Sequence, residues 1–328
     1  MKKIKFIFFT YKRAILLDGA IKSLLKHSSQ IEFPIEIIYH KSFLHIKSYQ
    51  KLKKRYGKKI KFYERKKESI FRYLKLFLHS TNIIGLIRWP QILYRFNSFK
   101  STLERIIINS KSNYICICPD DIVFFKNFFL PNKILSELDT NPNDLFISCT
   151  NNINLKKSDK CSKVNYKFIK IKFQKFLSWN IFDIGKENKN LNYNFLVEAG
   201  VYHKNSLLKL VKNSLFHNPI TMESNILKMV RKIGFYKNII TFYPRICASY
   251  QINSVQNDTM LRYNERLQIK PEKLQDIYLQ DYEINYRLTH KQKLQNFIIP
   301  KKIFFNKIGN KKIYSYSDLL NKIYLKIL

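Results

Sequence analysis

One stretch of the sequence, residues 114–125, reads Tyr114-Ile115-Cys116-Ile117-Cys118-Pro119-Asp120-Asp121-Ile122-Val123-Phe124-Phe125. Its first five residues lack polar alternation, which is typical of a central parallel strand covered on both faces. Pro119 has no N–H for a continuing ladder, so we predict that the strand ends there. Ligands of open α/β sheets bind beyond the carboxyl ends of the strands. Asp120 and Asp121 therefore lie at a candidate ligand site.

Two adjacent carboxylates are costly unless a cation lies between them. The pair therefore indicates a divalent-metal and sugar-nucleotide site, with Mn²⁺ or Mg²⁺ bound by Asp121 and hydroxyl groups of the donor bound by Asp120. A simpler alternative is a turn in which Asp120 only caps backbone N–H groups, since aspartate is frequent in turns.

The rest of the chain alternates strand-like and helix-like patterns. Strands are predicted at 4–9, 34–40, 59–63, 145–149, 196–203 and 239–243. Helices are predicted after the first of these strands, before the central strand, and at 204–211 and 219–233. This alternation predicts an α/β fold of the Rossmann-like kind, a mostly parallel sheet flanked by helices.

Two segments do not show this alternation of strand-like and helix-like patterns. Residues 65–96 form an aromatic and basic insertion, which suits either a bilayer interface or a buried helical layer. Residues 258–328 form a basic C-terminal extension that looks mainly helical, after a domain expected to span 1–257. We interpret the extension as a peripheral attachment to an anionic membrane surface; the alternative is a helical layer packed on the main domain.

The chain has 60 Lys and Arg against 23 Asp and Glu, a formal net charge of +37. Part of this surplus fits the codon bias of an AT-rich genome, yet it also favours phosphates, nucleic acid or anionic lipid as partners. Five cysteines suggest neither a disulfide framework nor a zinc site. No signal peptide or membrane-spanning run is evident, so we expect a cytoplasmic protein, peripheral on the inner face of the cytoplasmic membrane.

These pieces resemble the GT-A glycosyltransferases, most closely the inverting, nucleotide-sugar-dependent enzymes of family two that build bacterial surface glycans. Phe9-Thr10-Tyr11-Lys12-Arg13 looks like the opening turn of that family, with Lys12 in place of the usual Asn. Asp120-Asp121 takes the place of the acidic metal motif, although Pro119 stands where a further acid often lies. The resemblance covers roughly residues 4–257.

The resemblance implies roles for further residues. Glu223, at the head of a helix, is similar in placement to the catalytic base of the family, while a helix-dipole carboxylate is the alternative. Thr10, Tyr11 and Arg13 would contact the nucleotide. The polar stretch after Tyr250 corresponds to the loop over the pyrophosphate, where the donor would meet Asn253, Ser254 and Gln256.

The function implied is transfer of a sugar, by a hexosyltransferase-type reaction, from a nucleotide sugar to a hydroxyl of a glycan or lipid-linked acceptor. Metal-assisted inversion in lipopolysaccharide, capsule or related polysaccharide biosynthesis would follow. Two alternatives stay open: a basic nucleic-acid-binding protein, for which no recognised motif is present, and a non-catalytic membrane-associated protein on a degenerate transferase fold.

Overall fold

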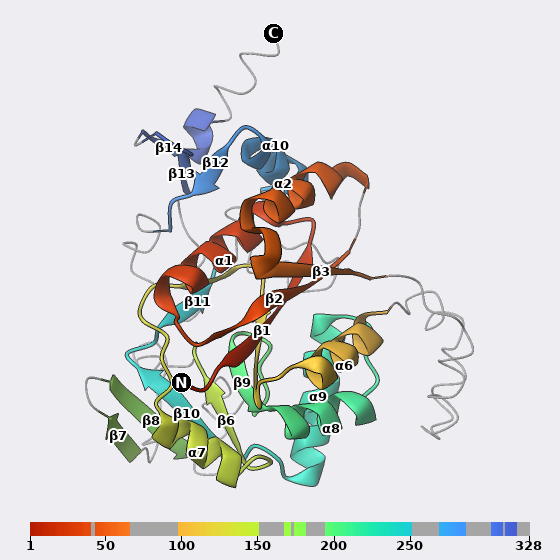
Figure 1. Ribbon diagram of the computed structural model, residues 1–328, viewed down its shortest axis with the longest axis vertical. Coiled ribbons are helices and arrows are strands. Elements are labelled where there is room, and N and C mark those ends of the chain that lie inside the picture. Colours follow the sequence, from red (N-terminus) through yellow and green to blue (C-terminus); the bar gives the residue numbers. More distant parts are fainter. Residues whose placement is uncertain are drawn as a thin grey trace.

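The computed structural model describes residues 1–40, 43–65, 98–150, 167–171, 174–181, 194–250, 269–286, 303–310 and 312–319. These residues form an α/β fold built on a nine-stranded sheet (Figure 1). The sheet order is β3-β2-β1-β4-β9-β6-β10-β8-β7. The predicted fold class, a large and mostly parallel sheet flanked by helices, is confirmed.

The strands of this sheet are β1 Ile4–Tyr11, β2 Ile31–His40, β3 Ile60–Glu64, β4 Tyr114–Pro119, β6 Leu145–Ser148, β7 Lys167–Ile171, β8 Gln174–Asn180, β9 Gly200–His203 and β10 Asn238–Tyr243. Parallel pairs join β1 to β2 and β4, β2 to β3, and β6 to β10. Antiparallel pairs join β9 to β4 and β6, and β8 to β7 and β10. Thus β8 and β9 are antiparallel to the other strands of the sheet.

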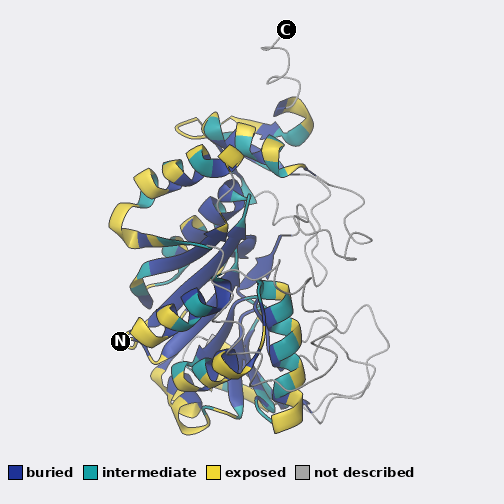
Figure 2. Cartoon of the chain, turned by 90° about the vertical axis from the view of Figure 1, so that its right-hand side faces the viewer, coloured by how far each residue is buried: buried dark blue, intermediate teal, exposed yellow. Residues whose placement is uncertain are grey.

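Helices cover both faces of the sheet. They are α1 Ala14–His27, α2 Ile46–Tyr56, α6 Phe99–Asn109, α7 Asn132–Thr140, α8 Lys204–Asn213, α9 Pro219–Ile233 and α10 Pro271–Leu279. Helices α1, α2, α7 and α10 pack on one core with Phe6 and Phe8 of β1, whereas α6, α8 and α9 pack on the other with Ile7 and Phe9. Figure 2 shows the buried sheet between helices whose outer faces are exposed.

Because successive side chains of a strand point to opposite faces, a strand buried on both faces must be apolar throughout. β1 and β4 meet this condition, and both lie at the centre of the sheet. The apolar run at 114–118 therefore correctly predicted a central strand of the sheet.

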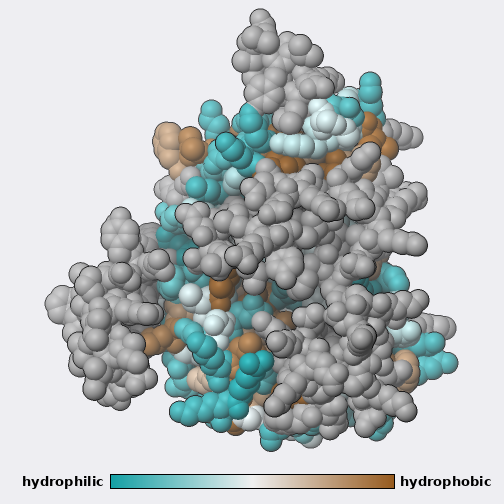
Figure 3. All heavy atoms as spheres, turned by 180° about the vertical axis from the view of Figure 1, so that it is seen from behind, coloured by the Kyte–Doolittle hydropathy of each residue, from teal (hydrophilic) through white to brown (hydrophobic). Residues whose placement is uncertain are grey.

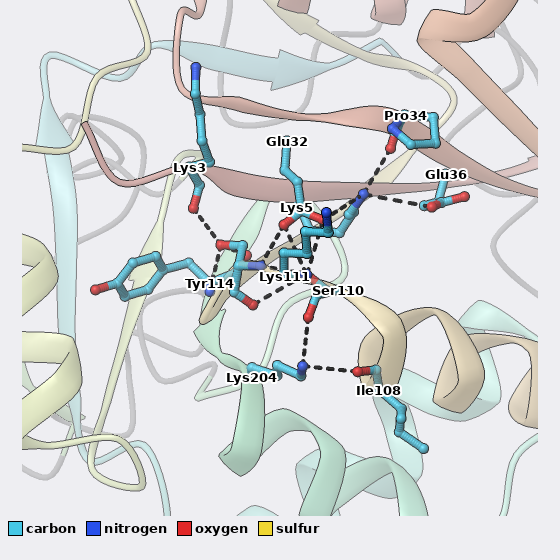
Figure 4. Close-up of polar contacts among 11 residues, drawn as sticks. Lys3, Lys5, Glu32, Pro34, Glu36, Ile108, Ser110, Lys111, Tyr114 and Lys204 are labelled. Atoms are coloured by element: carbon cyan, nitrogen blue, oxygen red, sulfur yellow. Dashed lines mark hydrogen bonds and ion pairs between the residues drawn. The ribbon is translucent and has the colours of Figure 1, made fainter.

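A polar network closes the amino end of the sheet (Figure 4). The Lys5 ammonium is 3% exposed and pairs with Glu32 at 2.9 Å and Glu36 at 3.6 Å. Burial opposes ionisation of Glu32, but Lys5 and the N–H groups of Lys111 and Ser112 outweigh it and lower the pKa of that carboxyl. This network ties β1 and β2 to the turn that leads into β4.

The opposite, carboxyl end of β1, β2 and β4 carries the turns at Tyr11, His40 and Pro119. Since β9 is antiparallel to β4, it begins at this same edge, where Gly200 pairs with Ile117. The predicted strand at 196–203 is thus shorter than expected and runs in the opposite direction, which brings the residues before Gly200 to the site.

The described part of the C-terminal extension contains α10 and an antiparallel sheet of β12 Tyr282–Ile284, β13 Phe304–Lys307 and β14 Ile313–Ser315. This sheet was not expected from the sequence. Apolar side chains of these elements, among them Leu274, Tyr278 and Phe305, belong to the same core as α1 and α2. The described residues of the extension therefore pack on the main domain, as the alternative interpretation predicted.

Some predictions fall on residues outside the described ranges. Nearly all of the insertion at 65–96 and the proposed boundary at 257 do so, and they stay predictions. Among the helices that the structure does describe, none has the length and apolar character required to cross a bilayer.

Packing of the extension against α1 and α2 predicts one cooperative unfolding unit. Phe305→Ala removes a fully buried ring and should lower the free energy of unfolding of the whole chain by about 3–5 kcal/mol, measured by urea unfolding. Ile308→Ala, at a side chain 39% exposed, serves as the control and should cost less than about 1 kcal/mol. A separate early transition in Phe305→Ala, with the main transition unchanged, would instead make the extension an independent domain.

Candidate active site

The predicted acidic pair is held by an arginine. Arg13 Nε donates to Asp120 Oδ2 at 3.1 Å, its Nη2 donates to Asp120 Oδ1, and its Nη1 donates to Asp121 Oδ2 at 3.3 Å. Asp120 is fully buried and Asp121 is 7% exposed. A single guanidinium therefore bridges both carboxylates at the carboxyl end of the central strands.

Two hydroxyl groups complete the coordination of the pair. Thr10 Oγ1, at the end of β1, donates to Asp120 Oδ2 at 2.7 Å. Ser249 Oγ donates to Asp121 Oδ1 at 2.7 Å. Ser249 is positioned by a two-stranded ribbon of β5 Ile122–Phe124 and β11 Cys247–Ser249, and the ribbon continues as Tyr250 N–H donates to Asp121 O at 2.8 Å.

Each of the four carboxylate oxygens thus accepts at least one hydrogen bond from Thr10, Arg13 or Ser249. A divalent ion on Asp121 would compete with Arg13 for these oxygens. No cluster of three or more acidic, histidine or cysteine ligands suited to a metal is found in the part of the chain that the structure describes. The expected metal on Asp121 stays a prediction.

Backbone strain marks both sides of this pair. Lys12, between Thr10-Tyr11 and Arg13, has φ of 58°, and Ala199 has φ of 54°. Residues other than glycine rarely adopt this left-handed region, and each instance costs on the order of 1–3 kcal/mol. Strain of this kind concentrates at functional sites, and here it falls on the two turns that face the acidic pair.

A third carboxylate, Glu198, comes from the loop before β9. Tyr202 pins this loop, because its hydroxyl accepts from Leu196 N–H at 2.7 Å and donates to Leu196 O at 2.8 Å. Gly200 is required there, since a Cβ would lie 2.7 Å from Leu196 O and 2.6 Å from the Tyr202 hydroxyl. Burial, reinforced by the charges of Glu223 and Asp121, raises the pKa of Glu198 to about 8.

Glu223 lies in the first turns of α9, which Asn218 caps through a hydrogen bond from Thr221 N–H. Val197 N–H donates to Glu223 Oε1 at 3.4 Å, so the loop before β9 also orients this carboxylate. Burial raises the pKa of Glu223 to about 7, and the bond from Val197 opposes that shift. The charges of Glu223 and Asp121 both contribute to the raised pKa of Glu198.

A flat aromatic surface lies beside the acidic pair, at the ends of β1 and β2. The rings of Tyr11 and His40 stack with centroids 5.3 Å apart and an interplanar angle of 27°. The Lys12 ammonium lies 5.0 Å from the centroid of Tyr11. Burial, then Arg65 and Lys12, lower the pKa of His40, so at neutral pH this ring is uncharged.

The C-terminal extension also reaches the site. Tyr286 packs edge-on against Tyr250, with ring centroids 5.3 Å apart, and neither hydroxyl has a hydrogen-bond partner. The Tyr286 ring occupies the space that a Cβ would take at Gly19 of α1. Burial, Tyr250, Asp18 and then Asp121 and Asp120 raise the pKa of Tyr286, so its phenol is within electrostatic reach of the pair.

Beneath the pair lies a thiol cluster made of Cys116, Cys118, Cys149 and Cys247, all buried. The sulfurs of Cys116 and Cys118 are 3.6 Å apart, and Cys149 contacts both Cys116 and Cys247 through its thiol. Buried cysteines behave as small apolar side chains. The cluster is part of the core that also contains Ile134 and Leu135 of α7.

Of the predicted site residues, the structure brings Thr10, Arg13, Asp120 and Asp121 into direct contact. Tyr11 lies beside them on the aromatic surface, and Glu223 is linked to them through Glu198. Asn253, Ser254 and Gln256 lie outside the described residues. Sequence reasoning missed Glu198, Ser249 and Tyr286; for Glu198 the signal was an acid inside an otherwise apolar stretch.

Comparison with protein-family models and with curated proteins gives no match. Solved structures similar to this chain include S. aureus TarS 1–349, at 12% identity and a TM-score of 0.40, covering 73% of this chain and 57% of that chain. The same protein in complex with UDP-GlcNAc matches at 10% identity and a TM-score of 0.35, with 73% and 55% covered. This chain thus spans less than two thirds of the TarS chains it matches.

A synthase and a synthetase are also among the similar structures. The 4-diphosphocytidyl-2C-methyl-D-erythritol synthase from Anaerococcus prevotii has 9% identity and a TM-score of 0.35, with 80% of this chain and 95% of that chain covered. A CMP:2-keto-3-deoxy-manno-octonic acid synthetase complexed with CTP has 11% identity and a TM-score of 0.34, with 74% and 89% covered.

The raised pKa of Glu198 predicts a pH-dependent penalty in stability. A carboxyl whose pKa is raised by folding destabilises the folded state above that pKa, and the penalty vanishes below its ordinary value of 4.5. Glu198→Gln should therefore raise the free energy of unfolding by at least about 1 kcal/mol more at pH 8.5 than at pH 4.5, since one pKa unit corresponds to about 1.4 kcal/mol.

Thermal or urea unfolding at the two pH values measures this difference. Glu137→Gln, at an exposed position on α7, is the matched control and should change little at either pH. The same gain at both pH values for Glu198→Gln would show that this carboxyl is not held as described.

Proposed function

We propose that this protein is a glycosyltransferase that moves a sugar from a nucleotide-sugar donor to a hydroxyl group of an acceptor. One arrangement carries the proposal: an acidic pair bridged by Arg13 at the carboxyl edge of the sheet, and Glu223, which accepts a hydrogen bond from Val197 in the loop before β9 and whose pKa of about 7 suits a general base. Sugar transfer needs both elements, one to hold the donor and one to accept the proton of the acceptor hydroxyl.

On the donor side, the aromatic surface of Tyr11 and His40 suits the face of a nucleobase, because flat rings bind one another by offset stacking. Lys12, at the rim of this surface, supplies a positive charge for the pyrophosphate. Carboxylate oxygens accept hydrogen bonds, so Asp121, the more exposed of the pair, would orient a hydroxyl group of the ribose or the sugar, while the buried Asp120, expected from the sequence to do so, holds Thr10 and Arg13.

On the acceptor side, Glu223 would take the proton as the acceptor oxygen attacks the anomeric carbon and the nucleoside diphosphate leaves. Attack from the face opposite the leaving group gives inversion in a single displacement. Glu198, with its higher pKa, stays protonated at neutral pH and so does not compete for the proton. The two pKa values thus assign Glu223 as the base and Glu198 as a neutral hydrogen-bonding group.

Arg13 takes the charge-balancing place that a divalent metal was expected to hold. A bound Mn²⁺ or Mg²⁺ would supply Lewis-acid stabilisation of the leaving diphosphate. In the observed geometry, the guanidinium between Asp120 and Asp121 instead fixes the pair and keeps it from repelling an anionic donor. We therefore propose transfer without a resident metal.

The acceptor proposed is a glycan or lipid-linked glycan of a bacterial surface polysaccharide, such as lipopolysaccharide or capsule. The large excess of Lys and Arg supports an anionic membrane surface as the place where a lipid-linked acceptor is met. The peripheral, cytoplasmic location inferred from the sequence belongs to the same proposal.

A pH profile combined with Glu223→Gln tests the base. Only the deprotonated carboxylate accepts a proton, so the wild-type rate of transfer should rise with pH and reach half its plateau near pH 7. Glu223→Gln should lower the rate by at least about a hundredfold and remove this midpoint, while donor affinity is retained.

The matched control is Ser224→Ala, at the next, exposed position of α9, which should leave both rate and profile unchanged. Parallel losses of donor affinity and rate in Glu223→Gln would make this residue structural and overturn its assignment as the base.

Removal of metal tests the role of Arg13. Transfer by the wild-type protein should persist within about twofold in excess EDTA, because Arg13 already pairs with both carboxylates. Arg13→Ala exposes two adjacent carboxylates, so it should lower donor affinity at least about tenfold and create Mn²⁺ binding that titration calorimetry detects without any donor. Stoichiometric Mn²⁺ binding by the wild-type protein, or loss of transfer in EDTA, would restore the metal site.

A further inference from the structure

Two large apolar side chains stand in solvent just before α2. In the short 3₁₀ helix η1 Phe43–His45, the side chain of Phe43 is 88% exposed and that of Leu44 is 62% exposed. Among the described residues, no other large hydrophobic residue beyond the N-terminal Met1 exceeds the exposure of Leu44. Adjacent exposed apolar residues on a soluble surface usually mark a contact with another apolar phase.

The helix that follows presents a basic face to the same side. Lys47, Gln50 and Lys54 are exposed at helical spacing, whereas Ser48, Tyr49 and Leu52 face the core. Between residues 43 and 63 there is no acidic residue, and the cations are Lys47, Lys51, Lys53, Lys54, Arg55, Lys58, Lys59 and Lys61.

Two of these cations form ion pairs with other parts of the chain. Lys51 pairs with Asp281 at 2.7 Å and Arg55 pairs with the buried Asp18, so both join α2 to its neighbours. Lys47, Lys53 and Lys54 of α2 have no acidic partner among the described residues. They leave an uncompensated positive charge next to Phe43 and Leu44.

This surface adjoins the edge of the sheet where the site lies, because η1 follows the end of β2 at His40. Figure 3 shows the molecule from behind, and hydrophobic atoms project from its outline at the upper left beside hydrophilic side chains. The half-turn between the two views exchanges left and right, so this is the side toward which α2 extends at the upper right of Figure 1. A ligand that covered this surface would lie close to the Tyr11–His40 stack.

We propose that Phe43, Leu44 and the exposed lysines of α2 form a membrane-docking surface for anionic lipid. The two apolar side chains enter the interface between headgroups and acyl chains, and Lys47 and Lys54 contact the lipid phosphates. Lysine stems cover apolar surface while their ammonium groups stay at headgroup depth. The inference rests on exposure and charge, and it holds whether or not the protein transfers sugars.

Nucleic acid is the other anionic partner that a basic surface with an aromatic residue could bind. Leu44 distinguishes the two, because an aliphatic side chain gains from an acyl phase and offers no face for base stacking. The combination of an exposed Phe and Leu beside lysines therefore favours lipid.

Vesicle co-sedimentation of the full chain tests the surface. The wild-type protein should bind vesicles that contain phosphatidylglycerol, bind pure phosphatidylcholine vesicles at least tenfold more weakly, and be released by salt. Phe43→Ser with Leu44→Ser should weaken binding at least tenfold. Lys47→Gln with Lys54→Gln should weaken it about 25-fold, at about fivefold, or about 1 kcal/mol, for each lysine.

A matched control lies on α9, at another part of the surface, where Lys228 and Lys232 are exposed and Ile233 is 45% exposed. Lys228→Gln with Lys232→Gln and Ile233→Ser removes the same charge and one apolar side chain, and it should leave vesicle binding within twofold of wild type. An equal loss in this control would reduce the effect to net charge and overturn the proposal.

Phe43→Trp gives a direct readout of insertion. Its emission, after subtraction of the wild-type spectrum, should shift to shorter wavelength when phosphatidylglycerol vesicles are added and should not shift with single-stranded RNA. An unshifted emission with bound vesicles, or a loss of RNA binding and not of vesicle binding in the Phe43 and Leu44 variants, would assign the surface to another partner.

Discussion

The bridge from Arg13 to Asp120 and Asp121 is the interaction on which the site depends. Two adjacent carboxylates, one fully buried, would repel each other and lose hydration without a cation between them. Arg13 can fill this place because β1 and β4 are parallel neighbours whose carboxyl ends meet at one edge. The strained turn at Lys12 directs the chain from β1 into α1 at the point where Arg13 must face the pair.

The rest of the edge is assembled from segments far apart in the sequence. The ribbon of β5 and β11 delivers Ser249, the loop pinned by Tyr202 delivers Glu198, and α10 with its following strand leads to Tyr286. Each segment is fixed by its own local device, whether a two-stranded pairing, a hydroxyl closing a loop, or the absence of a side chain at Gly19 and Gly200. Local order around the pair is therefore set independently at several points, which suits a preorganised electrostatic site.

The sequence was informative wherever a property is local. Apolar continuity identified β1 and β4, and the proline after Asn218 marked the start of α9. The direction of β9, and hence the position of Glu198, depends on long-range pairing that no local pattern encodes. The grouping of Cys116 and Cys118 with Cys149 and Cys247 was not predicted, because it depends on how the packed sheet brings distant segments together. The adjacent acids predicted a cation between them, and the structure places the guanidinium of Arg13 there, a contact between distant residues that no local pattern encodes.

The distribution of charge refines what a net charge of +37 means. Some cations are structural: Lys5 neutralises Glu32 and Glu36 inside the sheet, and Lys100 donates to the carbonyls of Lys212 and Ser214. Arg13 is paired with the acidic residues Asp120 and Asp121, whereas Lys47 and Lys54 of α2 are exposed and have no acidic partner among the described residues. Charge that is buried and paired fixes the fold, and only exposed, unpaired charge attracts a partner from a distance. Codon bias can raise the number of lysines, but it does not by itself place them beside an exposed Phe and Leu at the edge of the sheet that carries the site.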